Sequence, residues 1–423
     1  MLAFTFPGQG SQRPAMGASW ADHESFELVE HASDLVDVDV RALLLDADQE
    51  TLTHTANAQL ATFVLSLVVL DAAERLGLEP ALCAGHSLGE YSALVATGAL
   101  SYEEGLRLVA ERGAAMQDAA EQRPGTMMAV LGLDDDDVQA ACLRAEGEVW
   151  VANYNAPGQV AIAGEPEALR RAVEIAKSLG AKRVLSFPVG GAFHTPLMAP
   201  ARERLRKALA EVRLRTPEPV VVANVDARQH PDPGEWPGLL SAQLCGPVRW
   251  RQSLQTLYEA GARTFVELGP GSVLTGLARR TLTGEEVTSI SVTSPAELER
   301  LVERLAGLAD ASAAAPERRG DHFAMAERLV VSPATGPFLP HADFAHAAPK
   351  LTTAPHRAGD GAPPTQEPGR RRIAVGDLVG WAGEAEVRSP FAGTLEGLLV
   401  LEGERVVTGQ PVAWLRVLSE EDA

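Results

Sequence analysis

With 423 residues, the chain is long enough for about two or three domains of ordinary size. Its hydrophobic fraction of 46% and charged fraction of 22% are those of an ordinary globular protein. A formal net charge of −20 argues against general binding to nucleic acid or to an anionic membrane surface.

The first 310 residues alternate short β-rich runs with longer helical periods. This alternation predicts an α/β fold with a largely parallel sheet. Buried strands are expected at Leu2–Phe6, Ala81–Gly85, Val220–Ala223 and Thr264–Leu268, and helices at Ala58–Arg75, Tyr102–Ala120, Pro196–Glu211 and Pro270–Thr281.

Residues 125–189 are predicted to form a smaller unit within this region. The expected order is a strand at Thr126–Leu131, a helix at Asp135–Arg144, strands at Val149–Asn153 and Gln159–Ala163, a helix at Glu167–Leu179 and a strand at Arg183–Pro188. This β-α-β-β-α-β order is the ferredoxin-like arrangement. We therefore expect a subdomain inserted between residues 1–124 and 190–310, lying as a lid over a cleft.

The composition changes abruptly after Asp310. Residues 311–368 contain 14 Ala and 9 Pro among 58 residues, and large apolar side chains are too few there to build a core. Most of this stretch is expected to be linker or disordered, beginning with a linker at 311–325.

A repeated pattern towards the C-terminus predicts a small β unit made of two similar halves. Val331–Gly336 resembles Arg388–Gly393, and Val375–Val379 resembles Glu402–Val406. Each half carries S-P-x-x-G followed later by G-D/E-x-V, and the two halves are expected to pack face to face.

The three cysteines lie far apart and form no C-x-x-C pair, which indicates neither a disulfide framework nor a zinc site. The first residues, up to Pro7, lack the basic and long apolar segments of a signal peptide. The most apolar internal run, Phe63–Leu70, is far too short to span a bilayer. A cytoplasmic location without a membrane or metal partner is therefore expected.

The segment Gly85-His86-Ser87-Leu88-Gly89 has the pattern G-x-S-x-G between a predicted strand and a predicted helix. Glycines at both ends let the chain turn sharply and expose Ser87 Oγ. Free N–H groups at the start of the following helix would stabilise an anion formed there. Ser87 is thus a candidate nucleophile, although this motif alone also fits an incidental serine in a tight turn.

His194 is the candidate base for Ser87. Gly190 and Gly191 precede it and a proline follows it, so that it sits on a loop end just before a helix. Taken alone, a loop histidine is more often a solvated surface residue. His86 is a poorer candidate because neighbouring side chains diverge at such a turn, and we expect it to pack beneath the turn.

Six segments, in the same order along about 300 residues, resemble the malonyl-CoA:acyl-carrier-protein transacylases and the related acyltransferases of polyketide synthases. They are Phe6–Gln12 (FPGQGSQ), Gly85–Tyr91 (GHSLGEY), Arg112-Gly113, Ala152–Gln159 (ANYNAPGQ), Ala192–His194 (AFH) and Glu267–Gly271 (ELGPG). The resemblance implies that residues 1–310 are a malonyl acyltransferase domain. Its fold would be a hydrolase-like α/β domain with an inserted ferredoxin-like subdomain.

The resemblance also implies a role for each matching residue. Ser87 would be the nucleophile and His194 its base, while Gln243 matches the segment that orients this histidine without a third, acidic member. The backbone N–H groups of Gln9 and Leu88 would form the oxyanion hole. From its own pattern, the glycine-flanked loop that holds Gln9 could equally be a plain turn.

Arg112 lies in a predicted helix and, taken alone, would most simply be a solvated residue. In the family the arginine at this position binds the free carboxylate of the substrate, for which a planar guanidinium offers two parallel hydrogen bonds. Phe193 matches the malonyl-type pattern and would leave little room for the α-methyl group of methylmalonyl. Asn155 would line the cleft where the subdomain borders it.

The implied reaction is a ping-pong transfer. Ser87 would take the malonyl group from malonyl-CoA, and the phosphopantetheine thiol of an acyl carrier protein would take it from the serine. No bound cofactor or metal is expected. Because carrier proteins are acidic, a basic rim is expected, with Lys182, Arg183, Arg249, Arg251, Arg279 and Arg280 as candidates.

The C-terminal unit resembles a biotinyl/lipoyl-type flattened β-barrel, with Val387–Val417 as its second half and Val330–Phe338 and Ile373–Gly380 in its first. Such domains carry their cofactor on a hairpin lysine, but this chain has Trp381–Glu386 there and no lysine after Lys350. The resemblance implies a degenerate carrier domain at 326–423 with a long loop at about 339–371, holding no biotin or lipoate. It could bind a partner biosynthetic enzyme, support oligomerisation or cover the acyltransferase.

Two other functions stay open at this point. A serine hydrolase that releases malonate would share Ser87 and His194, but it gives less reason for Arg112 or for the inserted subdomain. A non-catalytic scaffold could merely present the C-terminal unit, although the intact Ser87, His194 and Arg112 argue against it. The receiving pathway, fatty-acid or polyketide, is also open, as are the cognate carrier protein and the oligomeric state.

Overall fold

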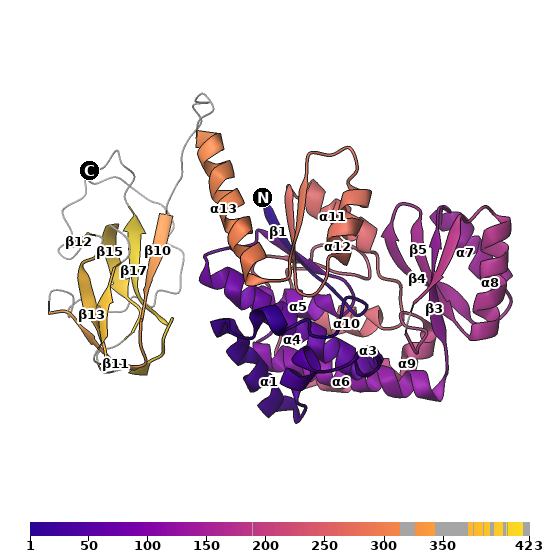
Figure 1. Ribbon diagram of the computed structural model, residues 1–423, viewed down its shortest axis with the longest axis horizontal. Coiled ribbons are helices and arrows are strands. Elements are labelled where there is room, and N and C mark those ends of the chain that lie inside the picture. Colours follow the sequence, from indigo (N-terminus) through magenta and orange to yellow (C-terminus); the bar gives the residue numbers. More distant parts are fainter. Residues whose placement is uncertain are drawn as a thin grey trace, which may run out of the picture. The chain divides into compact units, whose positions relative to one another are not determined.

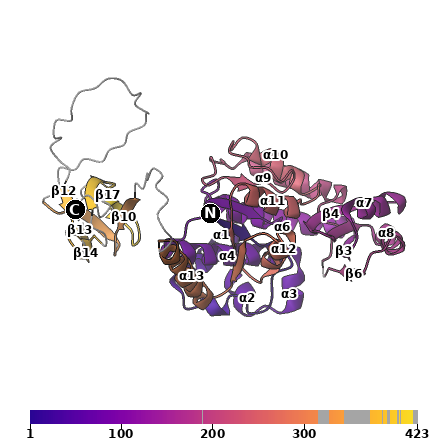
Figure 2. The same ribbon diagram turned by 90° about the horizontal axis from the view of Figure 1, so that it is seen from above.

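The computed structural model describes residues 1–187, 189–313, 326–342, 371–374, 376–383, 385–389, 393–400, 403 and 405–417. The chain divides into a larger unit, Met1–Ala315, and a smaller unit, Pro316–Ala423 (Figures 1 and 2). Each unit has a hydrophobic core of its own.

The larger unit contains a five-stranded parallel sheet in the order β7-β2-β1-β8-β9. The strands are β1 (Leu2–Phe6), β2 (Leu82–Gly85), β7 (Val221–Val222), β8 (Thr264–Leu268) and β9 (Thr288–Val292). The first four confirm the predicted strands. Strand β9 is not predicted from the sequence, because only Ser289 and Val292 in this edge strand are buried and it has no continuous apolar run.

The sheet is covered by helices on both faces. Consecutive strand residues point to opposite sides, and here both sides carry apolar residues that pack against helices. Phe4 and Val266 pack into the core that contains α4, whereas Ala3 and Phe265 pack into the core that contains α11 and α12. The helices are α1 (Glu27–Val36), α2 (Val40–Leu45), α3 (Gln49–Thr53), α4 (Thr55–Arg75), α5 (Gly89–Ala96), α6 (Tyr102–Gln122), α9 (Ala199–Ala210), α10 (Trp236–Gln243), α11 (Trp250–Glu259), α12 (Val273–Thr281) and α13 (Pro295–Ala313).

Three predicted helix starts are wrong, and the first is that of α4, which begins at Thr55 rather than Ala58. Helix α12 begins at Val273 rather than Pro270, because Gly269 and Gly271 adopt φ values of +137° and +83° that no right-handed helix allows. The segment predicted as one helix from Pro196 consists of a short 3₁₀ helix, Pro196–Met198, followed by α9.

Helix α4 is 21 residues long and, by length and composition alone, apolar enough to cross a membrane. It extends well beyond the short apolar run singled out in the sequence. Within the larger unit, 83% of its most apolar window is buried, which is the environment of a core helix.

Residues 126–186 form a subdomain with an antiparallel sheet in the order β4-β5-β3-β6 (Figure 1). Its elements follow one another as predicted: β3 (Thr126–Leu131), α7 (Asp135–Arg144), β4 (Val149–Ala156), β5 (Gln159–Gly164), α8 (Pro166–Ser178) and β6 (Arg183–Ser186). The Tyr154 N–H donates to Val248 O over 2.8 Å, which attaches β4 to the larger sheet domain. This attachment holds the polar end of β4 close to the carboxyl ends of the central strands.

The smaller unit contains two four-stranded sheets, β10-β17-β15-β12 and β14-β13-β11-β16. Its strands are β10 (Ala326–Val331), β11 (Gly336–Pro340), β12 (Arg371–Ile373), β13 (Leu378–Ala382), β14 (Ala385–Arg388), β15 (Gly393–Leu398), β16 (Arg405–Val406) and β17 (Pro411–Val417). Most of the long loop expected at 339–371, and residues 314–325 of the expected linker, lie outside the described residues. The beginning of that linker is wrong, since α13 continues to Ala313.

The repeated serines of this unit occupy equivalent places. Ser332 N donates to Gln410 O at 2.8 Å, and Gly409 N donates to Ser332 O at 2.7 Å. Ser389 N correspondingly donates to Asp377 O at 2.9 Å, and Gly376 N donates to Ser389 O at 2.7 Å. Each Ser-Pro segment is therefore held by the turn of the other half, which explains why the pattern occurs twice.

Candidate active site

Ser87 lies on a sharp turn between β2 and α5 with a φ of +53°, a left-handed value that is uncommon for a residue other than glycine. A Cβ atom on Gly85 would lie 1.9 Å from the carbonyl carbon of Gly89, and one on Gly89 would lie 2.0 Å from Phe6 O. The two flanking glycines are thus required by close backbone contacts. The turn is the strand-to-helix elbow predicted from G-x-S-x-G.

Asn224, which follows β7, holds the elbow from the side. Its Oδ1 accepts a hydrogen bond from Ser87 N at 2.7 Å, and its Nδ2 donates to Gly85 O at 2.7 Å. The side chain of Asn224 therefore replaces the backbone partners that the turn residues would have in a regular strand.

His194 faces Ser87 directly, with 2.8 Å between His194 Nε2 and Ser87 Oγ. The other ring nitrogen, Nδ1, lies 2.8 Å from the main-chain carbonyl oxygen of Gln243. A carbonyl oxygen can only accept, so Nδ1 carries the proton and Nε2 is free to accept the proton of the serine hydroxyl. Burial, together with the nearby Arg112 charge, lowers the pKa of His194 to about 3, and this keeps the ring neutral.

Arg112 points from α6 to the same hydroxyl and is only 1% exposed. Its Nη2 donates to Ser87 Oγ at 3.0 Å and to Gln243 Oε1 at 2.9 Å, and its Nη1 donates to Gln59 Oε1 at 2.6 Å. Burial lowers the pKa of the guanidinium, but these oxygen acceptors compensate its charge.

The Arg112 position depends on the neighbouring glycine. A Cβ atom on Gly113 would lie 2.9 Å from Ala56 Cα, so α6 and α4 approach too closely for a side chain there. This approach is what brings Gln59 of α4 within reach of the guanidinium.

These side chains surround a cavity of about 260 Å³ between the central sheet and the subdomain. Of the predicted site residues, those that line it are Gln9, Ser87, Arg112, Asn155, Phe193 and His194. Leu88 and Gln243 do not line the cavity, and both are buried. Among the described residues, neither the Gln9 nor the Leu88 amide donates a hydrogen bond to another backbone group.

The expectation that His86 packs beneath the turn is wrong. His86 lines the cavity, its Nε2 lies 2.9 Å from Asn155 Oδ1, and its ring packs edge-on against Trp250. Gly8 brings the first loop against it, since a Cβ atom there would lie 2.5 Å from His86 O. His86 therefore connects the elbow with the Gln9 loop and with the subdomain.

Three polar residues of the site were missed in the sequence: Gln59, Glu90 and Asn224. Gln59 is a fully buried polar residue in the apolar helix α4, and Asn224 follows a buried strand of a parallel sheet. Both positions are recognisable signals, since ligands bind beyond the carboxyl ends of such strands. Glu90 lies within the GHSLGEY segment at Gly85–Tyr91, but the sequence pattern alone predicts no role for it.

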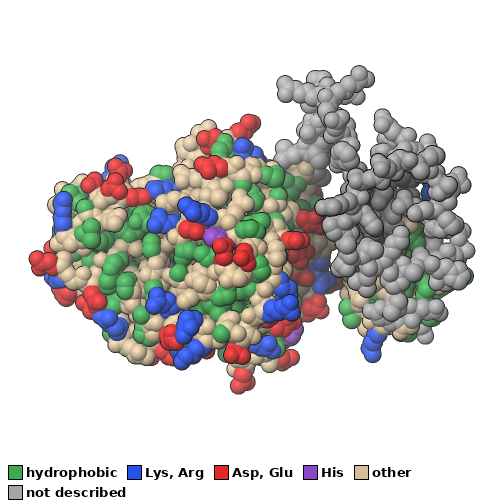
Figure 3. All heavy atoms as spheres, turned by 180° about the vertical axis from the view of Figure 1, so that it is seen from behind, with side chains coloured by type: hydrophobic (Ala, Val, Ile, Leu, Met, Phe, Trp, Pro, Cys, Tyr) green, Lys and Arg blue, Asp and Glu red, His purple; other side chains and the backbone are tan. Residues whose placement is uncertain are grey.

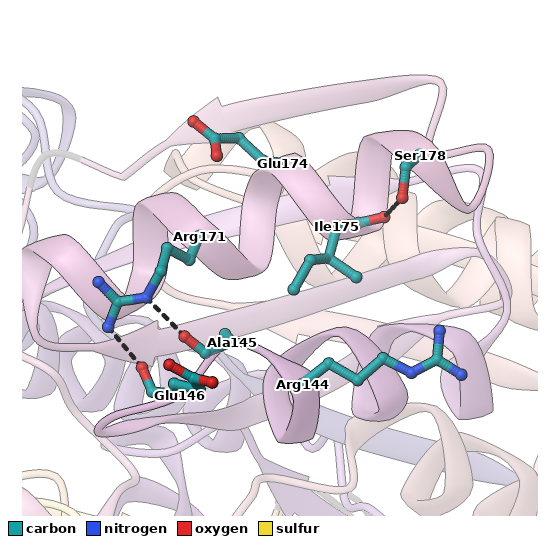
Figure 4. A pocket seen from close by; sticks show the side chains of 7 residues that line it. All are labelled: Arg144, Ala145, Glu146, Arg171, Glu174, Ile175 and Ser178. Atoms are coloured by element: carbon teal, nitrogen blue, oxygen red, sulfur yellow. Dashed lines mark hydrogen bonds between the residues drawn. The ribbon is translucent and has the colours of Figure 1, made fainter.

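A second hollow, of about 370 Å³, lies on the subdomain surface between α7 and α8 (Figure 4). Arg171 extends across it and donates to the carbonyl oxygens of Ala145 and Glu146, while Arg144 and Glu174 point away into solvent. Arg171 thus stabilises the turn after α7, and the charged groups around the hollow do not converge on a common point. This arrangement is typical of a surface depression and not of a binding site.

Comparison with known proteins assigns the class. A family model described as the acyl transferase domain matches residues 3–308. The malonyl CoA-acyl carrier protein transacylase of Bacillus subtilis is 37% identical over 309 residues, which cover 72% of this chain and 97% of the relative.

Two solved structures share the fold of the larger unit. The acyl-carrier-protein S-malonyltransferase of Burkholderia pseudomallei is 40% identical, with a TM-score of 0.69 and coverage of 71% of this chain and 99% of the other. A malonyl-transacylase in complex with its type II PKS acyl-carrier protein is 37% identical, with a TM-score of 0.69 and coverage of 72% and 99%. This chain belongs to the acyl transferase family and, within it, to the malonyl CoA-acyl carrier protein transacylases.

The elbow glycine gives a stability prediction. Replacing Gly89 by Ala would force a methyl group against Phe6 O, so we expect Gly89→Ala to destabilise the protein by about 3 kcal/mol or more. Gly276 of α12 is the matched control, because nothing lies within 4 Å of a Cβ atom there and Ala favours a helix by about 0.5–1 kcal/mol. Urea unfolding of both variants measures the difference; equal stability of Gly89→Ala and the unmutated protein would contradict the close contact.

The low pKa of His194 predicts how Ser87 reactivity depends on pH. Because the imidazole is neutral well below its ordinary pKa, labelling of Ser87 by a fluorophosphonate should show no inflection from about pH 5 to pH 8. Labelling rates measured by intact mass test this, with Ser87→Ala as the unlabelled control. An inflection near the ordinary histidine pKa would mean that the ring is neither buried nor close to Arg112.

Proposed function

We propose that this protein transfers the malonyl group from malonyl-CoA to the phosphopantetheine thiol of an acyl carrier protein, through a malonyl ester of Ser87. The proposal depends on one observation: the neutral imidazole of His194 and the buried guanidinium of Arg112 are both hydrogen-bonded to the Ser87 hydroxyl. The relatives named above, malonyl CoA-acyl carrier protein transacylases, support the same substrate and acceptor.

In the first half-reaction, His194 Nε2 takes the hydroxyl proton as Ser87 Oγ attacks the thioester carbonyl carbon. The negative charge moves to the carbonyl oxygen, where the Gln9 and Leu88 amides would donate hydrogen bonds to it. Loss of one such donor typically costs about 2.7–4 kcal/mol of transition-state stabilisation. The intermediate then expels the CoA sulfur, which takes the proton from His194.

In the second half-reaction the same groups act in reverse order. The thiol of the carrier protein gives its proton to His194 and attacks the ester carbonyl, and Ser87 Oγ leaves with that proton. The Gln243 carbonyl supports both steps, since it accepts from the Nδ1–H of the imidazolium that forms transiently.

Arg112 would recognise the malonyl carboxylate. In the free protein both Nη2 hydrogens are used by Ser87 Oγ and Gln243 Oε1, so a bound carboxylate would replace the Ser87 contact. An acetyl group would leave the buried guanidinium without this partner, and sites of this kind reject such analogues by as much as about 10⁴-fold. Phe193, at the cavity wall, would disfavour methylmalonyl more weakly, by about 1–3 kcal/mol.

The alternative functions receive less support from the geometry. A hydrolase that releases malonate would also use Ser87, His194 and Arg112, but it gives less reason for a subdomain that contributes Met127, Asn153 and Asn155 to the cavity wall. A non-catalytic scaffold has no use for the strained Ser87 conformation beside an aligned imidazole.

The carrier protein would dock by charge complementarity. Lys182, Arg183, Arg279 and Arg280 are exposed. Arg279 also donates to Ser289 O and Arg280 to Gln159 Oε1, while Arg251 pairs with Asp135 and Arg249 donates to Val225 O. On the face seen in Figure 3, basic and acidic side chains are interspersed, so docking would rest on a local cluster and not on the overall charge.

We also propose the fold of the inserted subdomain and the cellular location of the protein. The strand order β4-β5-β3-β6 supports a ferredoxin-like subdomain, inserted at about residues 125–189 into a hydrolase-like α/β domain of residues 1–310. Three free cysteines and a buried α4 support a cytoplasmic protein.

For the C-terminal unit at 326–423, we infer a carrier-type barrel that holds neither biotin nor lipoate, because the chain has no lysine beyond Lys350. The two four-stranded sheets related by the Ser332 and Ser389 contacts support this architecture. Its role would be to bind a partner enzyme or a second copy, or to cover the acyltransferase.

Intact-mass measurement tests the chemistry. Incubation with malonyl-CoA should add one malonyl group to the protein. Ser87→Ala should abolish this adduct, because among the described residues only the Ser87 hydroxyl is hydrogen-bonded to the His194 ring. A holo carrier protein should then receive the group. Free malonate as the main product would support the hydrolase, and absence of any adduct on the unmutated protein would support the scaffold.

Deletion of residues 326–423 tests the separate role of the smaller unit. All cavity-lining residues lie in the larger unit, so the shortened chain should still form the malonyl adduct at a rate within about threefold of the full chain. Stopped-flow or quenched-flow mass measurement gives this rate. A loss of adduct would place the smaller unit in the catalytic cycle.

A further inference from the structure

Glu90 is a buried carboxylate that the transfer chemistry described above does not use. It lies on α5 three residues after Ser87 and is 1% exposed. Its Oε1 accepts from the Asn224 main-chain N–H at 2.6 Å, and its Oε2 accepts from Gln243 Nε2. Both oxygens are therefore used, and both partners belong to segments that hold the site together.

The carboxylate determines which way round the Gln243 amide lies. A carboxylate only accepts hydrogen bonds, so the amide must turn its NH₂ group toward Glu90 and its oxygen away from it. In this orientation Gln243 Nε2 also donates to Ser87 O at 2.9 Å, and Gln243 Oε1 accepts from Arg112 Nη2 at 2.9 Å. With the amide reversed, an NH₂ group would face the guanidinium and an oxygen would face Ser87 O.

The geometry points to Glu90 as a positioning residue that fixes the Gln243 amide and, through it, the direction in which Arg112 presents its guanidinium to the substrate carboxylate. This inference rests on the proposed function. Glu90 would not touch the reacting atoms. Its effect would fall on recognition of the carboxylate and not on the Ser87–His194 pair, because His194 is held by the Gln243 main chain, which does not change when the amide turns.

Burial of Glu90 makes its ionisation depend on pH in the working range. Burial raises the pKa of Glu90 to about 7 and Asp226 adds to this, while the Asn224 and Gln243 donors and the Arg112 charge oppose it. Tyr91 of the same helix packs beside Arg112. Once protonated, Glu90 would turn an O–H group toward one of its two donors, so carboxylate recognition should weaken as the pH falls through about 7.

Glu90→Gln on the full chain is the decisive variant, because it keeps the size of the side chain but presents one NH₂ group. The Asn224 N–H is fixed in the backbone, so the new NH₂ would face Gln243 and reverse its amide. We expect kcat/KM for malonyl-CoA to fall about tenfold or more, mainly through KM, as for loss of a hydrogen bond to a charged group. Fluorophosphonate labelling of Ser87 should change by less than about threefold, since it does not involve carboxylate recognition.

Two further variants separate positioning from folding. Glu90→Asp keeps the carboxylate and should recover most of the preference for malonyl-CoA over acetyl-CoA. Glu297→Gln is the matched control, because Glu297 accepts hydrogen bonds from Thr293 N and Thr293 Oγ1 at the start of α13, away from the cavity. Glu297→Gln should change neither kcat/KM for malonyl-CoA nor the rate of Ser87 labelling. The pH dependence of malonyl-CoA recognition near 7 should disappear only in Glu90→Gln.

Binding of malonyl-CoA to the Ser87→Ala protein, measured by calorimetry with and without Glu90→Gln, provides a readout that needs no transfer. Weaker malonyl-CoA binding with unchanged acetyl-CoA binding supports the inference even if the unmutated protein forms no adduct, a result that would overturn only the proposed transfer. Unchanged binding and kinetics in Glu90→Gln would overturn the Glu90 inference alone. So would a proportional loss of Ser87 labelling and malonyl-CoA activity, because that pattern means simple misfolding. Absence of malonyl-CoA binding would overturn both.

Discussion

The buried guanidinium of Arg112 is the constraint around which the rest of the site is arranged. A cation at 1% exposure costs several kcal/mol in lost hydration unless acceptors surround it. The protein supplies these acceptors from three different segments: Gln59 on α4, Ser87 at the elbow and Gln243 at the end of α10. Each acceptor is itself fixed by other contacts, so the charge, the nucleophile and the orientation of the base are coupled in one hydrogen-bond network.

The parallel sheet explains how such distant segments meet. Gln9 follows β1, Ser87 follows β2, Asn224 follows β7 and the Gly269–Gly271 turn follows β8, so all four loops lie at the carboxyl edge of one sheet. The subdomain closes this edge because the backbone of β4 is bonded to Val248. Burial beside this cavity, together with the nearby Arg112 charge, keeps His194 neutral.

Local sequence patterns were sufficient for much of this arrangement. The elbow at Gly85–Gly89 and the order of the elements in the subdomain depend on neighbours within a few residues, and both are found where the patterns predict them. The start of α12 was misplaced, because the pattern of apolar residues continues through a turn whose glycines take left-handed φ values. The edge strand β9 was missed, because Thr288, Ile290 and Ser291 are only partly buried and the strand has no continuous apolar run.

The sequence by itself determined the family and, through its motifs, named Ser87, His194 and Arg112. Only the tertiary structure decided that they meet, that a main-chain oxygen of Gln243 orients the imidazole, and that His86 faces the cavity. It also revealed Gln59, Glu90 and Asn224 as partners in the network. The physical reason is that turns and periodic burial are encoded by adjacent residues, whereas a buried hydrogen-bond network is satisfied by groups that approach one another only when separate segments pack together. Every residue has a main-chain carbonyl, so residue identity cannot predict which carbonyl will accept the hydrogen bond from His194.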